Sequence, residues 1–214
     1  MKKVLFFLTL ITQFAFAQQA KFVNPDAILL KFASKVKNSS TISIEFKTTA
    51  RNPKTKFYEY LEGKQWVKGE KYYLAHGDVE EFANSGRYWS ILKDHQTVLS
   101  TKEKPYLTEL FINQFMVPIW NSDFNATYER EGMLLTDRVH IIKMTPKDPK
   151  KALYESIISY ITKESNELKK MVFFRKDGTS TDYVIDKLDF TTPIKDNVFE
   201  FKAENYPAYK ITEK

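Results

Sequence analysis

Short stretches in which apolar and polar residues alternate fill most of the chain, and they restrict its fold more than any other feature. In "ISIEF" (42–46) every second residue is apolar, which predicts a strand with one buried face, because successive side chains of a strand point to opposite sides. Turn sequences such as "RNPK" (51–54) and "KDG" (176–178) separate these stretches, and the last of the predicted strands covers 198–202. The pattern favours hairpins, and we predict a mainly β fold with a curved antiparallel sheet of about ten strands.

Two stretches have the spacing of a helix instead. Asn24-Pro25 is typical of a helix N-cap followed by proline in the first turn, and apolar residues recur at helical spacing after it. We predict a first helix from about Pro25 to Lys37. A second, very apolar helix is expected over 106–116. Its apolar stripe consists of Leu107, Leu110, Phe111 and Phe115.

Several of the predicted strands are apolar on both faces. In "RYWSIL" (87–92), Trp89 and Ile91 point to one side, and Tyr88 and Leu92 point to the other. Antiparallel sheets usually leave one face in water, so this sheet needs either a second cover or a cavity, and two short helices cannot cover its full width. The candidates to line such a cavity are large apolar residues of the strands and the second helix: Trp66, Tyr73, Phe82, Trp89, Leu92, Phe111, Phe115, Met116 and Phe173. The alternative is that the same side chains pack into a filled core.

The sequence contains no pattern of catalytic or metal-binding residues. The histidines His76, His95 and His140 form no H-x-H or H-E-x-x-H motif, and the two that lie in turns are expected to be solvated. The chain has no cysteine, no G-x-S-x-G elbow and only 6 glycines. We therefore expect no catalytic residues, no metal and no cofactor.

The charge of the chain is moderately basic. It has 33 basic and 27 acidic residues, which gives a formal net charge of +6. The basic residues are mostly lysines scattered along the sequence among the acids, whereas nucleic-acid binding requires a clustered stripe. The sequence argues against nucleic-acid binding and leaves open a weak attraction to anionic lipid head groups.

The first 17 residues, "MKKVLFFLTLITQFAFA", have the form of a secretory signal peptide. Two lysines precede an apolar run that is too short to span a bilayer, and the stretch closes on an A-x-A cleavage pattern at 15–17. Cleavage would leave residues 18–214, a length that fits a single domain. An exported chain without cysteine suits a bacterial periplasm, where we expect a monomer.

The order of the motifs resembles the periplasmic carriers of outer-membrane lipoproteins, the LolA-type family. The resemblance covers the chain from about Ala27 to Ile211, and its last third is the most similar part. The motifs that carry it are, in order, a helix, "TISIEFK" (41–47), "WVK" (66–68), "SGRYW" (85–89), an apolar mid-chain helix, a strand ending in "TPK" (145–147), "ELKKMVFFRKDG" (167–178) and "DNVFEF" (196–201).

The resemblance implies an unclosed antiparallel β-barrel of about ten to eleven strands with a helical lid over an apolar cavity. It further implies a carrier of lipoprotein acyl chains, which receives them from an inner-membrane ATP-driven lipoprotein-extraction complex and passes them to an outer-membrane acceptor. Three alternatives stay open: a carrier of another envelope lipid or apolar metabolite, a periplasmic hydrolase on a β-rich scaffold, and a structural envelope protein with a filled core.

One position departs from the pattern of the family. In its best-known members an arginine directly follows "WVK", tethers the lid and helps to govern release of the cargo. This chain has Gly69 there. The resemblance therefore marks Gly69 as a lid-control position and predicts a lid that is open more of the time.

Overall fold

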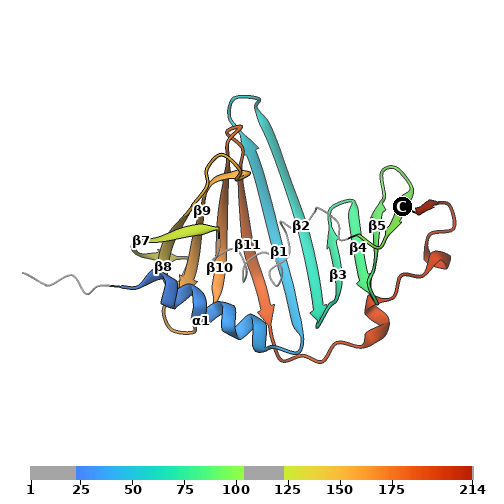
Figure 1. Ribbon diagram of the computed structural model, residues 1–214, viewed down its shortest axis with the longest axis horizontal. Helices are drawn as coiled ribbons and strands as arrows, with labels where there is room; N and C mark the ends of the chain where they lie inside the picture. Colours follow the sequence, from blue (N-terminus) through green and yellow to red (C-terminus); the bar gives the residue numbers. More distant parts are fainter. Residues whose placement is uncertain (1–22, 104–122, 214) are drawn as a thin grey trace, which may run out of the picture.

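The structure is a computed structural model that describes residues 23–103 and 123–213. In these residues the chain forms one α-helix and a sheet of twelve strands in the order β12-β6-β5-β4-β3-β2-β1-β11-β10-β9-β8-β7 (Figure 1). The elements are α1 (Pro25–Asn38), β1 (Ile42–Asn52), β2 (Phe57–Lys68), β3 (Lys71–His76), β4 (Val79–Asn84), β5 (Arg87–Leu92), β6 (Thr97–Thr101), β7 (Phe124–Leu134), β8 (Asp137–Pro146), β9 (Tyr154–Thr162), β10 (Leu168–Arg175), β11 (Ser180–Asp189), η3 (Asp196–Phe199), η4 (Ala203–Asn205) and β12 (Lys210–Glu213).

The sheet is antiparallel apart from the β12–β6 pair, and its edge strands β12 and β7 do not pair with each other, so the barrel is unclosed. This confirms the predicted fold class, with one strand more than expected. The predicted strand over 198–202 is wrong, because η3 ends there and the backbone turns again at η4. No helix among the described residues has the length and apolar character that a membrane span requires.

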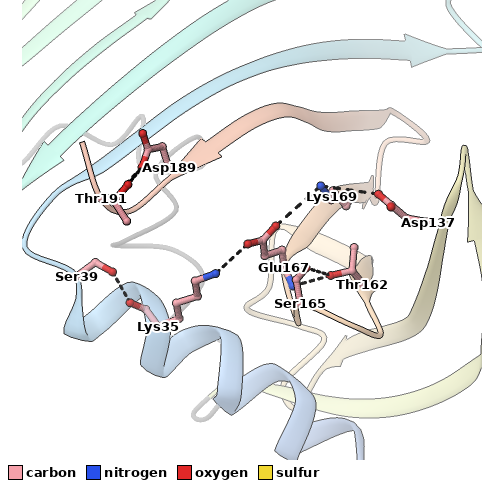
Figure 2. A network of polar contacts seen from close by, with 9 residues as sticks. All are labelled: Lys35, Ser39, Asp137, Thr162, Ser165, Glu167, Lys169, Asp189 and Thr191. Carbon is pink, nitrogen blue, oxygen red and sulfur yellow. Dashed lines mark hydrogen bonds and ion pairs between the residues drawn. The ribbon is translucent and has the colours of Figure 1, made fainter. Parts of the chain in front are cut away.

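The predicted first helix is confirmed. The Asn24 side chain accepts a hydrogen bond from the Ala27 amide at 3.3 Å and satisfies one of the unpaired amides of the first turn. The buried stripe is Leu29, Phe32, Ala33 and Val36. On the exposed side, Lys35 pairs with Glu167 at 2.9 Å and so ties α1 to the β9–β10 turn (Figure 2). The helix lies across one end of the strands β8 to β11 and β1 (Figure 1).

We call the face of the sheet that α1 covers the inner face and the opposite one the outer face. Ile42, Ile44 and Phe46 of β1 share a buried core with the apolar stripe of α1. Directly opposite residues of paired strands lie on the same face, so the register extends the inner face across the sheet. The row that begins at Ile44 continues through Gln65, Leu74, Glu81 and Ser90.

The neighbouring row lies on the outer face and is strongly aromatic. Trp66, Tyr73, Phe82 and Trp89 are consecutive partners across β2, β3, β4 and β5. The ring centroids of Trp66 and Tyr73 are 5.2 Å apart, and those of Tyr73 and Phe82 are 4.9 Å apart. An aromatic row of this size needs a cover on the outer face.

Residues 190–213, which we call the C-terminal arm, provide this cover. The Phe201 ring stacks on Trp89 with centroids 5.6 Å apart, and Phe82 and Ile91 belong to the same buried cluster. The Tyr206 hydroxyl donates a hydrogen bond of 2.6 Å to Glu80. At the end of the arm, β12 pairs in parallel with β6. The C-terminal arm therefore covers the outer side of "RYWSIL", and on the inner side Tyr88 packs against the core that includes α1.

Candidate functional site

A cavity of about 740 Å³ opens on the inner face, on the part of the sheet away from α1. Its size falls within the roughly 300–1,000 Å³ of typical small-molecule sites. Strands β1, β2, β3, β10 and β11 supply most of the wall, and turns at the same end of the sheet complete it. The lining residues are Thr48, Ala50, Phe57, Glu59, Leu61, His76, Asp78, Val79, Tyr154, Asp94, Phe173, Arg175, Asp177, Thr179, Thr181 and Tyr183.

One part of the cavity wall is apolar and aromatic. Phe173 and Tyr154 lie with ring centroids 5.4 Å apart, and Tyr183 stacks on Phe46 at 4.5 Å. Ala50 and Leu61 are half-buried and contribute aliphatic surface. A hydrocarbon chain can bury its surface against this part of the wall without forming a specific polar contact.

Polar groups also line the cavity, among them the Tyr183 side chain and the His76 ring. The Tyr183 hydroxyl is buried and has no hydrogen-bond partner among the described residues, and Tyr183 is only 2% exposed. Burial raises the pKa of Tyr183 well above its ordinary value, so the hydroxyl keeps its proton and can donate a hydrogen bond. The hydroxyl oxygen has almost no accessible surface, so a ligand in the cavity would reach it only if neighbouring side chains moved.

His76 departs from its expected solvated position. It ends β3 at the cavity, and its Nε2 lies 2.8 Å from the Thr48 hydroxyl. Burial lowers the pKa of His76, which favours the neutral ring. Among the described residues, no group of three histidine or acidic side chains could hold a metal ion.

The candidate cavity residues predicted from the sequence are divided between the two faces. Phe173 lies in the wall of the cavity, and Leu92 is half-buried on the inner face of β5. Strand alternation puts the other four on the outer face, away from the cavity, where they pack in the aromatic row and against the C-terminal arm. These four are Trp66, Tyr73, Phe82 and Trp89.

The remaining candidates lie outside the described residues. They are Leu107, Leu110, Phe111, Phe115 and Met116, together with the predicted helix over 106–116 and the predicted signal peptide over 1–17. Tyr154 and Tyr183 of the cavity wall were not among the predicted candidates, although both belong to strands with an alternating apolar pattern. Nothing local to these residues indicates which of the two covered faces they point to.

Gly69 occupies the turn between β2 and β3 with φ at +59°, where a Cβ atom would meet open space. It lines a small hollow beside the end of α1 together with Val36 and Ser39. The turn therefore favours glycine for a backbone reason that is independent of any control of a lid.

Replacing Gly69 with arginine is expected to lower the free energy of unfolding by about 1 kcal/mol, because a side chain is disfavoured in the left-handed region. Chemical denaturation of the two proteins measures the difference. Asparagine tolerates this conformation better, so Gly69→Asn serves as the control and should cost less. An arginine variant as stable as the parent would show that the turn relaxes at no cost.

No protein-family model matches the chain, and no curated protein is similar to it at a significant level. Solved structures are similar at low sequence identity. An uncharacterized conserved protein from Thermus thermophilus has 10% identity and a TM-score of 0.55, over 89% of this chain and 100% of that one. A LolA superfamily protein from Nitrosomonas europaea has 9% identity and a TM-score of 0.42, over 84% and 99% of the two chains. The MucA/MucB complex of Pseudomonas aeruginosa has 12% identity and a TM-score of 0.49, over 85% of this chain and 62% of that one.

These likenesses concern the fold alone. The twelve-stranded unclosed sheet with a helix on its inner face is the architecture that the resemblance to LolA-type carriers implied. The fold and the cavity together define a class of protein, an open half-barrel that offers an apolar hollow on its inner face.

Proposed function

We propose that the protein is a periplasmic carrier that binds acyl chains of lipoproteins in the inner-face cavity and moves them from the inner to the outer membrane. The observation that carries the proposal is the aliphatic and aromatic wall formed by Ala50, Leu61, Tyr154 and Phe173 on one face of an open sheet. The order of motifs along the sequence supports lipoproteins as the cargo. In this proposal, an inner-membrane ATP-driven extraction complex is the donor, and the acceptor lies at the outer membrane.

An open apolar cavity suits a task of reversible burial. Each methylene group removed from water is worth about 0.8 kcal/mol, so an acyl chain strongly favours a cavity over the aqueous periplasm. A carrier must also release its cargo, and a cavity that stays open on one side leaves part of the chain accessible to the acceptor.

The test uses two neighbouring residues of β1 that point to opposite faces. Ala50→Trp places a large ring in the cavity, whereas Thr49→Trp places the same ring on the outer face, and both positions are half-buried. We expect Ala50→Trp to weaken the binding of a fluorescent fatty-acyl probe by about tenfold, as the loss of a few buried methylene groups would. Thr49→Trp should bind the probe as the parent does.

Equal affinities for the two tryptophan variants would contradict the proposal, because the cavity would then not be the binding site. A hydrolase is the alternative from another class, and the same probe distinguishes it. A carrier returns an ester-linked probe unchanged after extraction, whereas a hydrolase releases the free acid. Mass spectrometry of the recovered probe measures which of the two has occurred.

A further inference from the structure

Three loops protrude at the end of the sheet away from α1, beside the mouth of the cavity (Figure 1). They are the β1–β2 turn (53–56), the β8–β9 loop (147–153) and a segment (175–178) that consists of the last residue of β10 and most of the β10–β11 turn. We call these three segments together the basic rim. Arg175 and Asp177 of the basic rim line the cavity itself, so the rim borders its opening.

Hydrogen bonds hold the three segments of the basic rim to one another. The buried Asn52 amide donates to the Asp177 carbonyl at 3.3 Å and to the Thr179 hydroxyl at 3.1 Å, and its oxygen accepts from the Lys54 amide at 3.0 Å. The Lys176 ammonium donates to the Pro149 carbonyl. The basic rim is therefore a connected platform, because each loop is fixed to the next.

The basic rim concentrates the charge of the protein. It has seven basic and two acidic side chains, a formal net charge of +5, whereas the whole chain has +6. Six of the lysines that look scattered along the sequence thus lie close together at one end of the sheet. The basic residues are Lys54, Lys56, Lys147, Lys150, Lys151, Arg175 and Lys176, and the acidic ones are Asp148 and Asp177.

The two acidic side chains of the basic rim are engaged in its own turns. Asp148 accepts a hydrogen bond from the Lys150 amide at 3.1 Å, and Asp177 accepts one from the Thr179 amide at 2.8 Å. Glu59, Asp78 and Asp94 line other parts of the cavity. The charge around the mouth is therefore polarised, with the basic side on the protruding loops.

Large apolar side chains are exposed next to these lysines. Tyr58 is 68% exposed, Leu153 is 60% exposed and Phe57 is 46% exposed. Aromatic and leucine side chains among lysines are typical of surfaces that lie in the interface of a bilayer, where lysine reaches the head groups and the apolar groups enter the region below.

We propose that the basic rim docks on the surface of a membrane rich in anionic lipids and turns the mouth of the cavity toward the bilayer. The charge complementarity and the exposed apolar groups favour a lipid surface over an acidic protein. The composition also disfavours nucleic acid, which is more often recognised by arginine, and six of the seven basic residues are lysines. This inference rests on the proposed function for its purpose, since docking would shorten the path of an acyl chain between cavity and bilayer.

The test is sedimentation with vesicles of phosphatidylcholine, made with or without phosphatidylglycerol. The full mature chain should bind only the anionic vesicles, and added salt should weaken the binding. The triple variant Lys54→Gln, Lys56→Gln and Lys150→Gln should lose about a hundredfold in affinity, because each lysine near an anionic surface contributes roughly fivefold.

The matched control removes the same charge at exposed positions of α1 and the C-terminal arm with Lys31→Gln, Lys37→Gln and Lys202→Gln. It should bind vesicles as the parent does. Equal loss in both triple variants would overturn the proposal, because net charge and not the basic rim would then govern binding. Absence of salt-sensitive binding in the parent would also overturn it, and an acidic protein would then be the better partner. Binding of the acyl probe in solution is measured in parallel and should be the same in all three proteins. If the probe does not bind, the proposed function is contradicted, whereas the vesicle measurement alone tests the docking.

Discussion

Gly63→Ala is expected to lower the free energy of unfolding by about 2 kcal/mol or more. Gly63 lies opposite Phe46 on the inner face, and the Phe46 ring covers it, so that a Cβ atom at position 63 would lie 2.3 Å from Cζ of that ring. The ring cannot simply move away, since Tyr183 stacks on it at 4.5 Å and His76 at 5.5 Å. Overpacking of a filled core costs about 1–3 kcal/mol, and it should exceed the small gain of alanine over glycine in a strand.

Gly132→Ala is the matched control for this prediction. Its Cβ atom would lie 2.8 Å from Cδ1 of Ile141, the far end of a flexible side chain that can rotate aside. We expect little change in stability there. Adding Phe46→Leu to Gly63→Ala should recover part of the loss, and a double-mutant cycle in urea measures the coupling. Additive effects of the two substitutions would show that the ring is not the obstacle.

Because of Glu81, we expect the free energy of unfolding to decrease as the pH rises from about 4.5 to about 7. It is fully buried on the inner face, where it accepts hydrogen bonds from the Tyr72 hydroxyl at 3.3 Å and the Ser90 hydroxyl at 3.4 Å. Burial raises its pKa from 4.5 to about 7, and the two hydrogen bonds only partly oppose this. The folded state therefore holds a proton that the unfolded chain has released.

The folded state binds more protons than the unfolded state between pH 4.5 and 7, so the free energy of unfolding falls as the pH rises. The contribution of neutral Glu81 is fully present below pH 4.5 and is lost as the pH rises through 7, a change of about 3 kcal/mol. The difference in unfolding free energy between the parent and Glu81→Gln, measured from acid to neutral pH, isolates this group. The difference should shift against the parent as the pH rises.

The adjacent Glu80 provides a control of opposite sign. It lies on the outer face, where burial would raise its pKa but hydrogen bonds from Lys93 and Tyr206 lower it. The parent should therefore gain stability over Glu80→Gln as the pH rises through the acid range. A pH-independent difference for Glu81→Gln would mean that this carboxyl reaches water in the folded state.

Local patterns predicted the elements of the fold well. The Asn24-Pro25 start of α1 and the alternation in β1 depend on neighbours in sequence, so they are readable without a structure. The two-sided character of "RYWSIL" was also readable, since it requires only that both faces be covered. The cover of each face was not readable. Phe201 is far from Trp89 in sequence, and the two rings meet only in three dimensions, with Tyr206 stacked on Phe201.

The candidate site depended still more on contacts between distant segments. Four aromatic residues were expected in the cavity because they are large. The size of a residue does not indicate which of the two faces of the sheet contains the cavity. Similarly, Lys56, Lys150 and Lys176 are far apart in sequence, and only the shared end of three hairpins brings them together. Properties that arise from the register and from the meeting of turns are outside the reach of a local pattern.

The C-terminal arm has a consequence for how the chain reaches its folded state. β12 pairs with β6, and Arg87 at the start of β5 bonds to Glu213 at 2.9 Å, so the final residues complete a part of the sheet formed from the first half of the sequence. Contacts between such distant segments close a long loop and slow folding, to milliseconds or seconds in typical all-β proteins. Until the arm arrives, the edge of β6 and the aromatic row stay exposed. This part of the sheet therefore reaches its final structure only after residues 210–213 have been synthesised and have paired with β6.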